Sequence, residues 1–186
     1  MNLLNLKSAE EFRAWLEENA AKEKECWVNA KRVKPGLAPF VYLDAVEEAL
    51  CFGWIDSVWK NIDGVFYQRF SPRKKNSPWT ELNKARARRL IRLGKMTELG
   101  KKSLPPLGPR SYIFDPIVID ELKKAKVYSK FKSFPSLYQR IRVYNVAFYR
   151  NKDKKTYEAA LSHLIEKTKK GEMYGEWNDY GRLNED

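Results

Sequence analysis

The dipeptide Asp63-Gly64, placed between two runs of strand-forming residues, constrains the fold of this chain more than any other feature. Residues 55–62 and 65–70 are rich in valine, isoleucine and aromatic side chains. An Asp-Gly pair between two such runs favours a two-residue turn, because both turn positions need a positive φ angle that aspartate and glycine tolerate. The sequence therefore predicts an antiparallel β-hairpin over residues 55–70.

Most of the remaining sequence carries helical patterns. Apolar residues recur three and four positions apart, as they do on the buried side of a helix. One such helix, over residues 42–52, is expected to end at Gly53 in a left-handed cap and to place Glu47 and Glu48 on its polar side. Further elements are expected as helices at residues 9 to the low twenties, 78–93, from 97, from 116, 120–131, 136–149 and 153–170, and as a strand at 26–33. The predicted fold class is α+β, mostly helical, with a small antiparallel sheet built around one hairpin.

The length of the chain and one Pro-rich stretch suggest its domain organisation. At 186 residues and 43% hydrophobic, the chain is able to bury a core of its own. Three prolines and a glycine fall between Leu104 and Ser111, which predicts an irregular connector over residues 104–114. We therefore expect a core over residues 1–103, and a helical extension with a tail over residues 115–186 that packs on the core.

The cysteines and the apolar runs indicate the compartment. Cys26 and Cys51 lack the spacing of a metal or redox motif and have apolar neighbours, which favours reduced, buried thiols. The N-terminus lacks a signal-peptide pattern, and no window of the sequence is apolar enough to span a bilayer. The expected location is the cytoplasm, with no transmembrane segment.

The chain is strongly basic, and its positive charge is concentrated. The net charge is +12, and residues 69–102 hold twelve basic residues against two acidic ones. A focused positive field attracts nucleic acids, anionic membranes or acidic metabolites. One interpretation is a nucleic-acid-binding helix face that contacts phosphates, and the other is a solvated helix face. The basic residues of that face are Arg86, Arg88, Arg89 and Arg92.

The end of the hairpin combines cations with a predicted helix start. Asp56 follows a Gly-Trp-Ile corner, where its carboxylate is placed to orient Arg69 or Arg73, either for an anionic ligand or as a structural ion pair. Arg73 and two lysines precede a helix that Ser77 is expected to cap, with Pro78 at its first position. Because the amide groups at a helix N-terminus attract anions, this segment predicts an anion-binding surface.

No complete catalytic constellation is present in the sequence, and no metal or cofactor is expected. His163 is the single histidine and there is no cysteine cluster, which disfavours a zinc site and a Ser-His-Asp triad. A metal-free enzyme that uses Asp56 with Arg73 on an unknown substrate stays open as a third interpretation. The aromatic residues near the cations are interpreted either as core residues or as a stacking surface for bases or sugars. They are Trp54, Trp59, Phe66, Tyr67 and Trp79.

A long motif and several short ones extend from the second predicted helix to residue 100. They are Glu48-Ala-Leu-Cys-Phe-Gly-Trp-Ile-Asp56, Arg69-Phe70, Pro72-Arg73, Ser77, Trp79, Asn83, Leu90, Gly94, Lys95-Met96-Thr97 and Gly100. Over roughly residues 8–103 this pattern resembles the YdeI/OmpD-associated family, also called bacteriocin-protection proteins. The resemblance implies bacterial origin, a compact and mostly helical α+β body, and an association with tolerance of antimicrobial peptides or envelope stress. It implies no known reaction.

The C-terminal signature of that family is not matched here. The corresponding positions are Asn151-Lys152, Lys155-Thr156-Tyr157 and Ala160, without the two arginines and the glutamate of the family pattern. The sequence as a whole favours a stress-associated binding protein that holds an anionic ligand or a protein partner. Its ligand, partner and oligomeric state are left open. The candidate ligand-binding residues are Trp54, Asp56, Arg69, Arg73, Ser77, Trp79 and Asn83.

Overall fold

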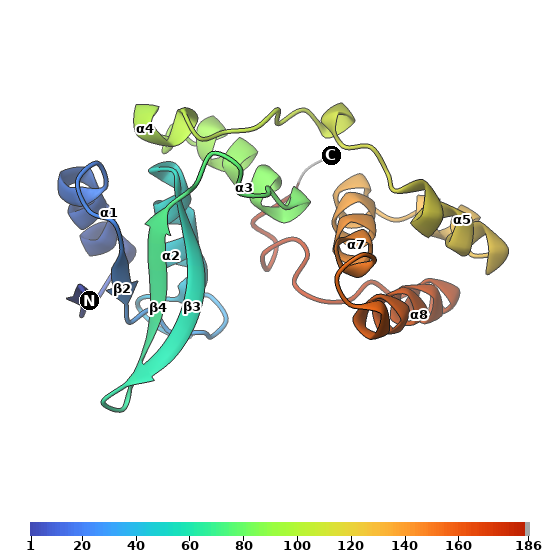
Figure 1. The fold of residues 1–186 in the computed structure, drawn as a ribbon, viewed down its shortest axis with the longest axis horizontal. Helices are drawn as coiled ribbons and strands as arrows, with labels where there is room; N and C mark the ends of the chain where they lie inside the picture. The colour runs from blue at the N-terminus through green and yellow to red at the C-terminus, as the bar shows by residue number, and fades with distance from the viewer. Residues whose placement is uncertain (185–186) are drawn as a thin grey trace. The chain divides into compact units, whose positions relative to one another are not determined.

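The computed structural model describes residues 1–184 of the chain. Two compact units are present: Met1–Pro78 with Arg86–Pro105, and Trp79–Ala85 with the residues from Pro106 onward. The first unit contains both helices and strands and the second is helical, which confirms a mostly helical α+β fold (Figure 1). Residues 79–85 belong to the second unit although they precede the Pro-rich stretch. That the helical extension packs on the core stays a prediction.

A small sheet is the centre of the first unit. In spatial order its strands are β1 (Leu3–Leu4), β2 (Cys26–Val28), β4 (Val65–Pro72) and β3 (Trp54–Ile62). Strands β3 and β4 form the predicted hairpin, and the φ angles of Asp63 and Gly64 are 50° and 83°. Strand β1 runs parallel to β2, so the sheet is mixed rather than antiparallel. Strand β2 ends at Val28, short of the predicted residue 33, and beyond it the side chain of Asn29 accepts the backbone N–H of Leu6.

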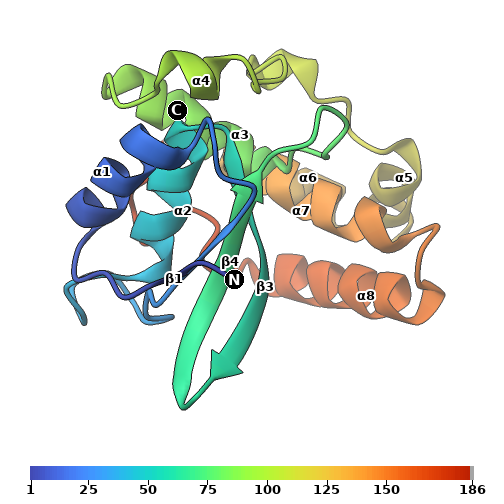
Figure 2. The ribbon, with the colours of Figure 1, turned by 60° about the vertical axis from the view of Figure 1, so that its left-hand side comes forward.

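Two helices pack beside this sheet. Helix α1 (Ala9–Asn19) lays Phe12 against Phe70 of β4, with ring centroids 5.4 Å apart and both side chains fully buried. Helix α2 (Tyr42–Cys51) packs on both α1 and β3. The turn end of the hairpin extends beyond both helices (Figure 1 and Figure 2). The base of the hairpin is therefore part of the core, while its far half is exposed.

The polar side predicted for α2 is wrong. Glu47 and Glu48 are only 6% and 3% exposed. Their burial is possible because cationic side chains from other elements form ion pairs with them. Arg13 Nη1 and Lys95 Nζ donate to the two carboxylate oxygens of Glu48 over 2.9 and 3.0 Å. Arg89 Nη1 donates to Glu47 over 2.7 Å. Burial opposes the charge of Arg13, but the hydrogen bond and the negative charge of Glu48 outweigh it and raise the Arg13 pKa.

Helix α3 (Glu81–Arg92) begins later than the predicted residue 78. The backbone N–H of Ser77 donates to the Lys74 carbonyl in a turn, so Ser77 is not a helix cap. Thr80 takes that role, since its Oγ1 accepts the N–H of Asn83 over 3.1 Å. The apolar positions of the sequence predict a buried stripe of Leu82, Ala85, Leu90 and Leu93, which is partly wrong because Leu93 lies past the helix end and is 53% exposed. The fully buried residues of α3 are Ala85, Ala87 and Leu90.

The second unit is built from the start of α3 and from helices that follow the Pro-rich stretch. Beyond a short 3-10 turn at Pro109–Ser111, these are α5 (Pro116–Lys124), α6 (Tyr128–Lys132), α7 (Ser136–Tyr149) and α8 (Lys154–Lys170). Asp115 caps α5 and also binds Arg150 Nη1 over 2.5 Å. The single helix predicted over 120–131 is two helices, because Lys126 has a φ of 57° and interrupts it. Within residues 1–184, no helix combines the length and the apolar character needed to cross a membrane.

Candidate functional site

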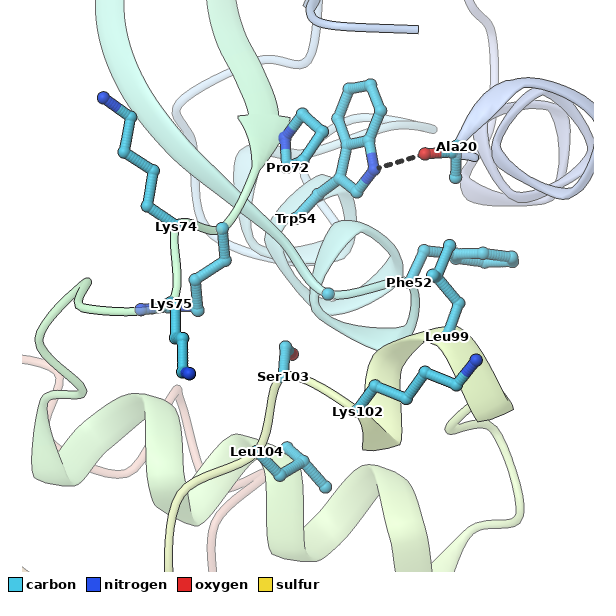
Figure 3. Close-up of a pocket in the computed structure, with 12 residues that line it drawn as sticks. Ala20, Phe52, Trp54, Pro72, Lys74, Lys75, Leu99, Lys102, Ser103 and Leu104 are labelled. Atoms are coloured by element: carbon cyan, nitrogen blue, oxygen red, sulfur yellow. Dashed lines mark hydrogen bonds between the residues drawn. The ribbon is translucent and has the colours of Figure 1, made fainter. Parts of the chain in front are cut away.

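A pocket of about 550 Å³ opens in the first unit, at the base of the hairpin. Phe52, Trp54 and Leu99 contribute apolar walls, and cationic side chains line the rest of the opening (Figure 3). These cations are Arg73, Lys74, Lys75 and Lys102. Smaller pockets in the second unit, of about 310 and 390 Å³, are lined mainly by aromatic residues around Tyr144 and Phe148. The pocket at the hairpin base therefore stands out by its charge.

One side of this pocket is fixed by the corner between α2 and β3. Gly53 ends α2 with a φ of 73°, a conformation that residues with a side chain rarely adopt. Its carbonyl accepts the backbone N–H of Arg73 over 2.9 Å, which links the basic loop, residues 71–76, to the corner. A Cβ atom on Gly53 would lie 3.0 Å from Ser103 Oγ. Glycine thus allows the hairpin base and the 102–104 segment to approach closely.

The other side is fixed by the short helix α4 (Glu98–Lys101). Thr97 caps this helix by accepting the N–H of Gly100, and its Oγ1 donates to the Cys51 carbonyl over 2.7 Å. A Cβ atom on Gly100 would lie only 2.1 Å from that carbonyl oxygen, so α4 meets the end of α2 at a position that has no room for a side chain. Ser103 Oγ donates to the Gly100 carbonyl over 2.8 Å, which continues the connection to the pocket.

The charged side chains that line the pocket are all of one sign among the described residues. Among the described residues that line it, none is acidic. Arg73 Nη1 donates to the Pro78 carbonyl over 3.0 Å, which holds this guanidinium beside the loop. In the view of Figure 3, Lys75 and Lys102 lie on opposite sides of Ser103. Cations gathered around a pocket repel one another, so an anion that binds between them lowers the electrostatic energy of the site.

The structure brings together only part of the predicted ligand-binding set. Trp54 and Arg73 line the pocket. Trp54 is 1% exposed and its Nε1 donates to the Ala20 carbonyl over 3.2 Å, so its ring supports the wall instead of offering a free face. Trp79 and Asn83 belong to the second unit and Ser77 lies in the turn after the basic loop, so these three are not among the pocket residues.

Asp56 and Arg69 have partners other than each other. Asp56 Oδ2 accepts the hydroxyl of Tyr42 over 2.7 Å, and Arg69 Nε donates to Glu25 Oε2 over 2.7 Å. Burial and the charge of Asp56 raise the pKa of Tyr42, so its hydroxyl stays protonated and keeps this bond. Both pairs link the hairpin to neighbouring segments of the first unit and are structural.

The predicted nucleic-acid face on α3 is less positive than its sequence suggests. Arg89 is neutralised by its bond to the buried Glu47, as described above. Arg86 and Arg88 are half-buried, and Arg92 is exposed. A phosphate-contacting role for all four arginines stays a prediction, and the exposed charge that would support it is confined to part of the helix.

The pocket hydroxyl is engaged in a hydrogen bond, and the two thiols of the first unit are buried. Ser103 is the single hydroxyl among the described pocket residues, and its hydrogen is donated to a backbone carbonyl. Burial and the charge of Glu48 raise the pKa of the Cys51 thiol to about 12, and burial also raises that of Cys26, which keeps both thiols un-ionised. Within residues 1–184, no group of three or more His, Cys, Asp and Glu side chains is placed to hold a metal ion. The arrangement is suited to binding by charge and shape.

Sequence reasoning found the basic loop but missed Lys102 and Ser103. The sequence does contain a signal for this region. Thr97 is suited to cap a short helix, and Gly100 leaves one side of that helix without a side chain, so that another element can approach closely. What this helix approaches is a long-range contact that the sequence does not specify.

A family model described as a domain of unknown function, DUF8412, matches residues 4–103. The chain belongs to the DUF8412 family. Of the pocket-lining residues, only Leu104 lies outside the matched DUF8412 region. No curated protein and no solved structure matches the chain. Because the DUF8412 match assigns no activity, the resemblance to the YdeI/OmpD-associated family stays a prediction.

Proposed function

We propose that the DUF8412 region is a binding domain for a small, multiply charged anion, held in the pocket at the hairpin base without chemical change. The observation that carries this proposal is the pocket lining, in which Arg73, Lys74, Lys75 and Lys102 meet and none of the described lining residues is acidic. A volume of about 550 Å³ is within the usual range of small-molecule sites.

The exposure of the lysines favours a ligand with several charges. Lys74, Lys75 and Lys102 are exposed, and a single ion pair at an exposed site contributes only about 0–1 kcal/mol. A ligand that contacts several of these cations at once gains from each of them, and the planar guanidinium of Arg73 adds a donor geometry that fits phosphate or carboxylate oxygens. Oligophosphates and tricarboxylates have this chemistry.

Binding is best tested by calorimetric titration of the full chain with pyrophosphate, tripolyphosphate and citrate at low salt. We expect the triple variant Lys74→Gln, Lys75→Gln, Lys102→Gln to bind the preferred anion at least about tenfold more weakly, because three attractive contacts are lost together. The matched control replaces three exposed lysines of the second unit, Lys155, Lys169 and Lys170, with glutamine. It changes the net charge equally and should retain the affinity.

Two results would contradict the proposal. An equal loss of affinity in both triple variants would show that net charge, and not the pocket, determines binding. Absence of saturable binding to all three anions would remove the pocket as a site for this ligand class. Phosphorus NMR on the same samples tests the absence of chemistry, since hydrolysis of pyrophosphate or tripolyphosphate by the wild type would mean that the domain is an enzyme.

The resemblance to the YdeI/OmpD-associated family supplies a proposed setting for this binding. We propose a role in bacterial tolerance of antimicrobial peptides or envelope stress, inside the cytoplasm. The shared motif from Glu48 to Asp56 supports the first part, and the free, buried state of Cys26 and Cys51 supports a reducing compartment. Deleting the gene should lower the peptide concentration that inhibits growth, and the lysine triple variant should fail to restore it where the control triple variant does.

A further inference from the structure

A continuous stack of side chains, here called the ladder, runs from the start of α2 to the exposed half of the hairpin. Its members, in order, are Tyr42, Arg32, Trp59 and Phe66. The guanidinium carbon of Arg32 lies 4.4 Å from the centroid of the Tyr42 ring and 5.1 Å from that of Trp59. The rings of Trp59 and Phe66 are stacked, with centroids 4.3 Å apart and an angle of 16° between their planes. Three aromatic rings and one cation thus form a single layered surface.

The outer part of the ladder is open to solvent. Trp59 is 44% exposed and Phe66 is 47% exposed, whereas the other tryptophans of the described chain are buried or half-buried. Both residues belong to the half of the hairpin nearer its turn, Trp59 in β3 and Phe66 in β4. Large aromatic side chains kept on a surface in this way are common in binding sites, because they contribute much contact area with few rotatable bonds.

A buried side chain holds the ladder in place. Gln68 is 0% exposed, and its Oε1 accepts a hydrogen bond from Arg32 Nη2 over 2.6 Å. Its Nε2 donates to the carbonyl of Val58 over 3.1 Å. This carbonyl lies at the irregularity between Asp56 and Trp59, where the pairing of strands β3 and β4 shifts register. The same amide therefore satisfies the β-bulge and fixes the guanidinium between two rings. Arg32 is ordered before any ligand binds.

The ladder has a cation of its own in Arg32, which is exposed. Lys31 is an exposed neighbour of Arg32 in the chain, whereas Lys60 follows Trp59 in β3 and its side chain therefore points to the opposite face of the hairpin. The carboxylate of Asp56 accepts the hydroxyl of Tyr42 and is occupied within the fold. A surface that joins aromatic faces to cations has the chemistry that unpaired bases and their phosphates need.

We propose that the ladder is a binding site for single-stranded nucleic acid, in which an unpaired base extends the stack on the outer face of Phe66 while Arg32 attracts a phosphate. This site is separate from the pocket and does not rest on the function proposed for it. A membrane surface is the main competing partner for exposed aromatic residues. The hairpin turn argues against it, because Asp63 is acidic and Asn61 Oδ1 accepts the N–H of Gly64, which makes the leading end of the hairpin polar.

The test measures fluorescence anisotropy of labelled oligo(dT) and oligo(U), with the full chain, at about 50 mM salt and then across a salt series. We expect saturable binding of the single strands and weaker binding of a duplex. Trp59→Ala and Phe66→Ala should each weaken binding on the order of tenfold, because Phe66 supplies the stacking face and Trp59 supports that ring from its other side. Trp59→Phe should retain most of the affinity. Val65→Ala is the matched control, since Val65 is an exposed apolar residue of the same hairpin outside the ladder.

Circular dichroism and thermal unfolding of each variant separate loss of binding from loss of fold. The proposal is overturned if the wild type does not bind single strands, if folded Trp59→Ala binds as the wild type does, or if Val65→Ala loses as much affinity. It is also overturned if the pocket triple variant loses much more affinity than the control triple variant, which would place the nucleic acid in the pocket. Binding to anionic phosphatidylserine vesicles with a blue-shifted tryptophan emission, without binding to oligonucleotides, would assign the ladder to membranes.

Discussion

Gly100→Ala is expected to lower the free energy of unfolding by about 3 kcal/mol, at the upper end of what overpacking a core usually costs. The added methyl group would lie 2.1 Å from the Cys51 carbonyl oxygen and 2.7 Å from Met96 Sδ. Met96 could turn its side chain away, but the backbone carbonyl of α2 cannot move without breaking its bonds from Thr97. Alanine is the better helix former, so a loss of stability can only come from the contact.

Urea denaturation followed by tryptophan fluorescence measures this loss. Gly108→Ala is the matched control, because Gly108 has no atom within 4 Å of the position of a Cβ and no positive φ angle. The control should unfold like the wild type. If Gly100→Ala were equally stable, helix α4 would not be packed against α2, and the pocket wall that contains Lys102 and Ser103 would have to be placed elsewhere. Anion binding by a Gly100→Ala protein that is still folded should be weakened for the same reason.

The second large effect is expected from Glu48→Gln. This change removes the charge of a 3% exposed carboxylate that binds Arg13 and Lys95, and leaves the half-buried Arg13 guanidinium to the weaker, exposed carboxylate of Glu17, 3.3 Å away. Removing one member of a buried pair typically costs 3–5 kcal/mol, and the lower end applies here because the Lys95 side chain is 49% exposed. We therefore expect the free energy of unfolding to fall by about 3 kcal/mol.

The same urea experiment distinguishes this role from a general effect of charge. Glu98→Gln removes an equal charge from an exposed pair with Lys101 and should leave the unfolding curve unchanged. A Glu48→Gln variant as stable as Glu98→Gln would mean that Arg13 finds another partner or reaches solvent. In that case the ion pairs of Glu48 would contribute little to the stability of the first unit.

Features that depend on neighbours in sequence could be predicted. The Asp63-Gly64 turn fixed the hairpin, and the helices over 136–149 and 153–170 were predicted close to their observed bounds. Their signals are local, because a turn or a cap is decided by the φ angles and hydrogen bonds of a few adjacent residues. The start of α3 was predicted wrongly, because Ser77 was expected to cap the helix and Thr80 caps it. A hydroxyl at either position is able to accept a backbone N–H, and the fold decides which one does.

Features that depend on distant partners could not be predicted. Glu47 and Glu48 read as the polar side of an amphipathic helix, and they are buried because arginines and a lysine far along the chain reach them. The candidate site shows the same limit. Arg73 was predicted from its loop, whereas Asp56 was expected to orient Arg69 or Arg73 and instead binds Tyr42, and Arg69 binds Glu25. Carboxylates and guanidinium groups are abundant in this sequence, and their pairing is decided by the fold.

The division of α3 between two units affects how the protein is made. Glu81 is 1% exposed and its Oε2 lies 3.4 Å from Arg140 Nε, inside the unit whose other residues begin at Pro106. A fragment that starts at the Pro-rich stretch would carry this buried arginine without its carboxylate. During synthesis, residues 79–85 leave the ribosome long before α7. The first unit can fold as soon as Pro105 has emerged. The second unit can fold only after its last helices have emerged, and it must then pack against residues 79–85, which were translated earlier.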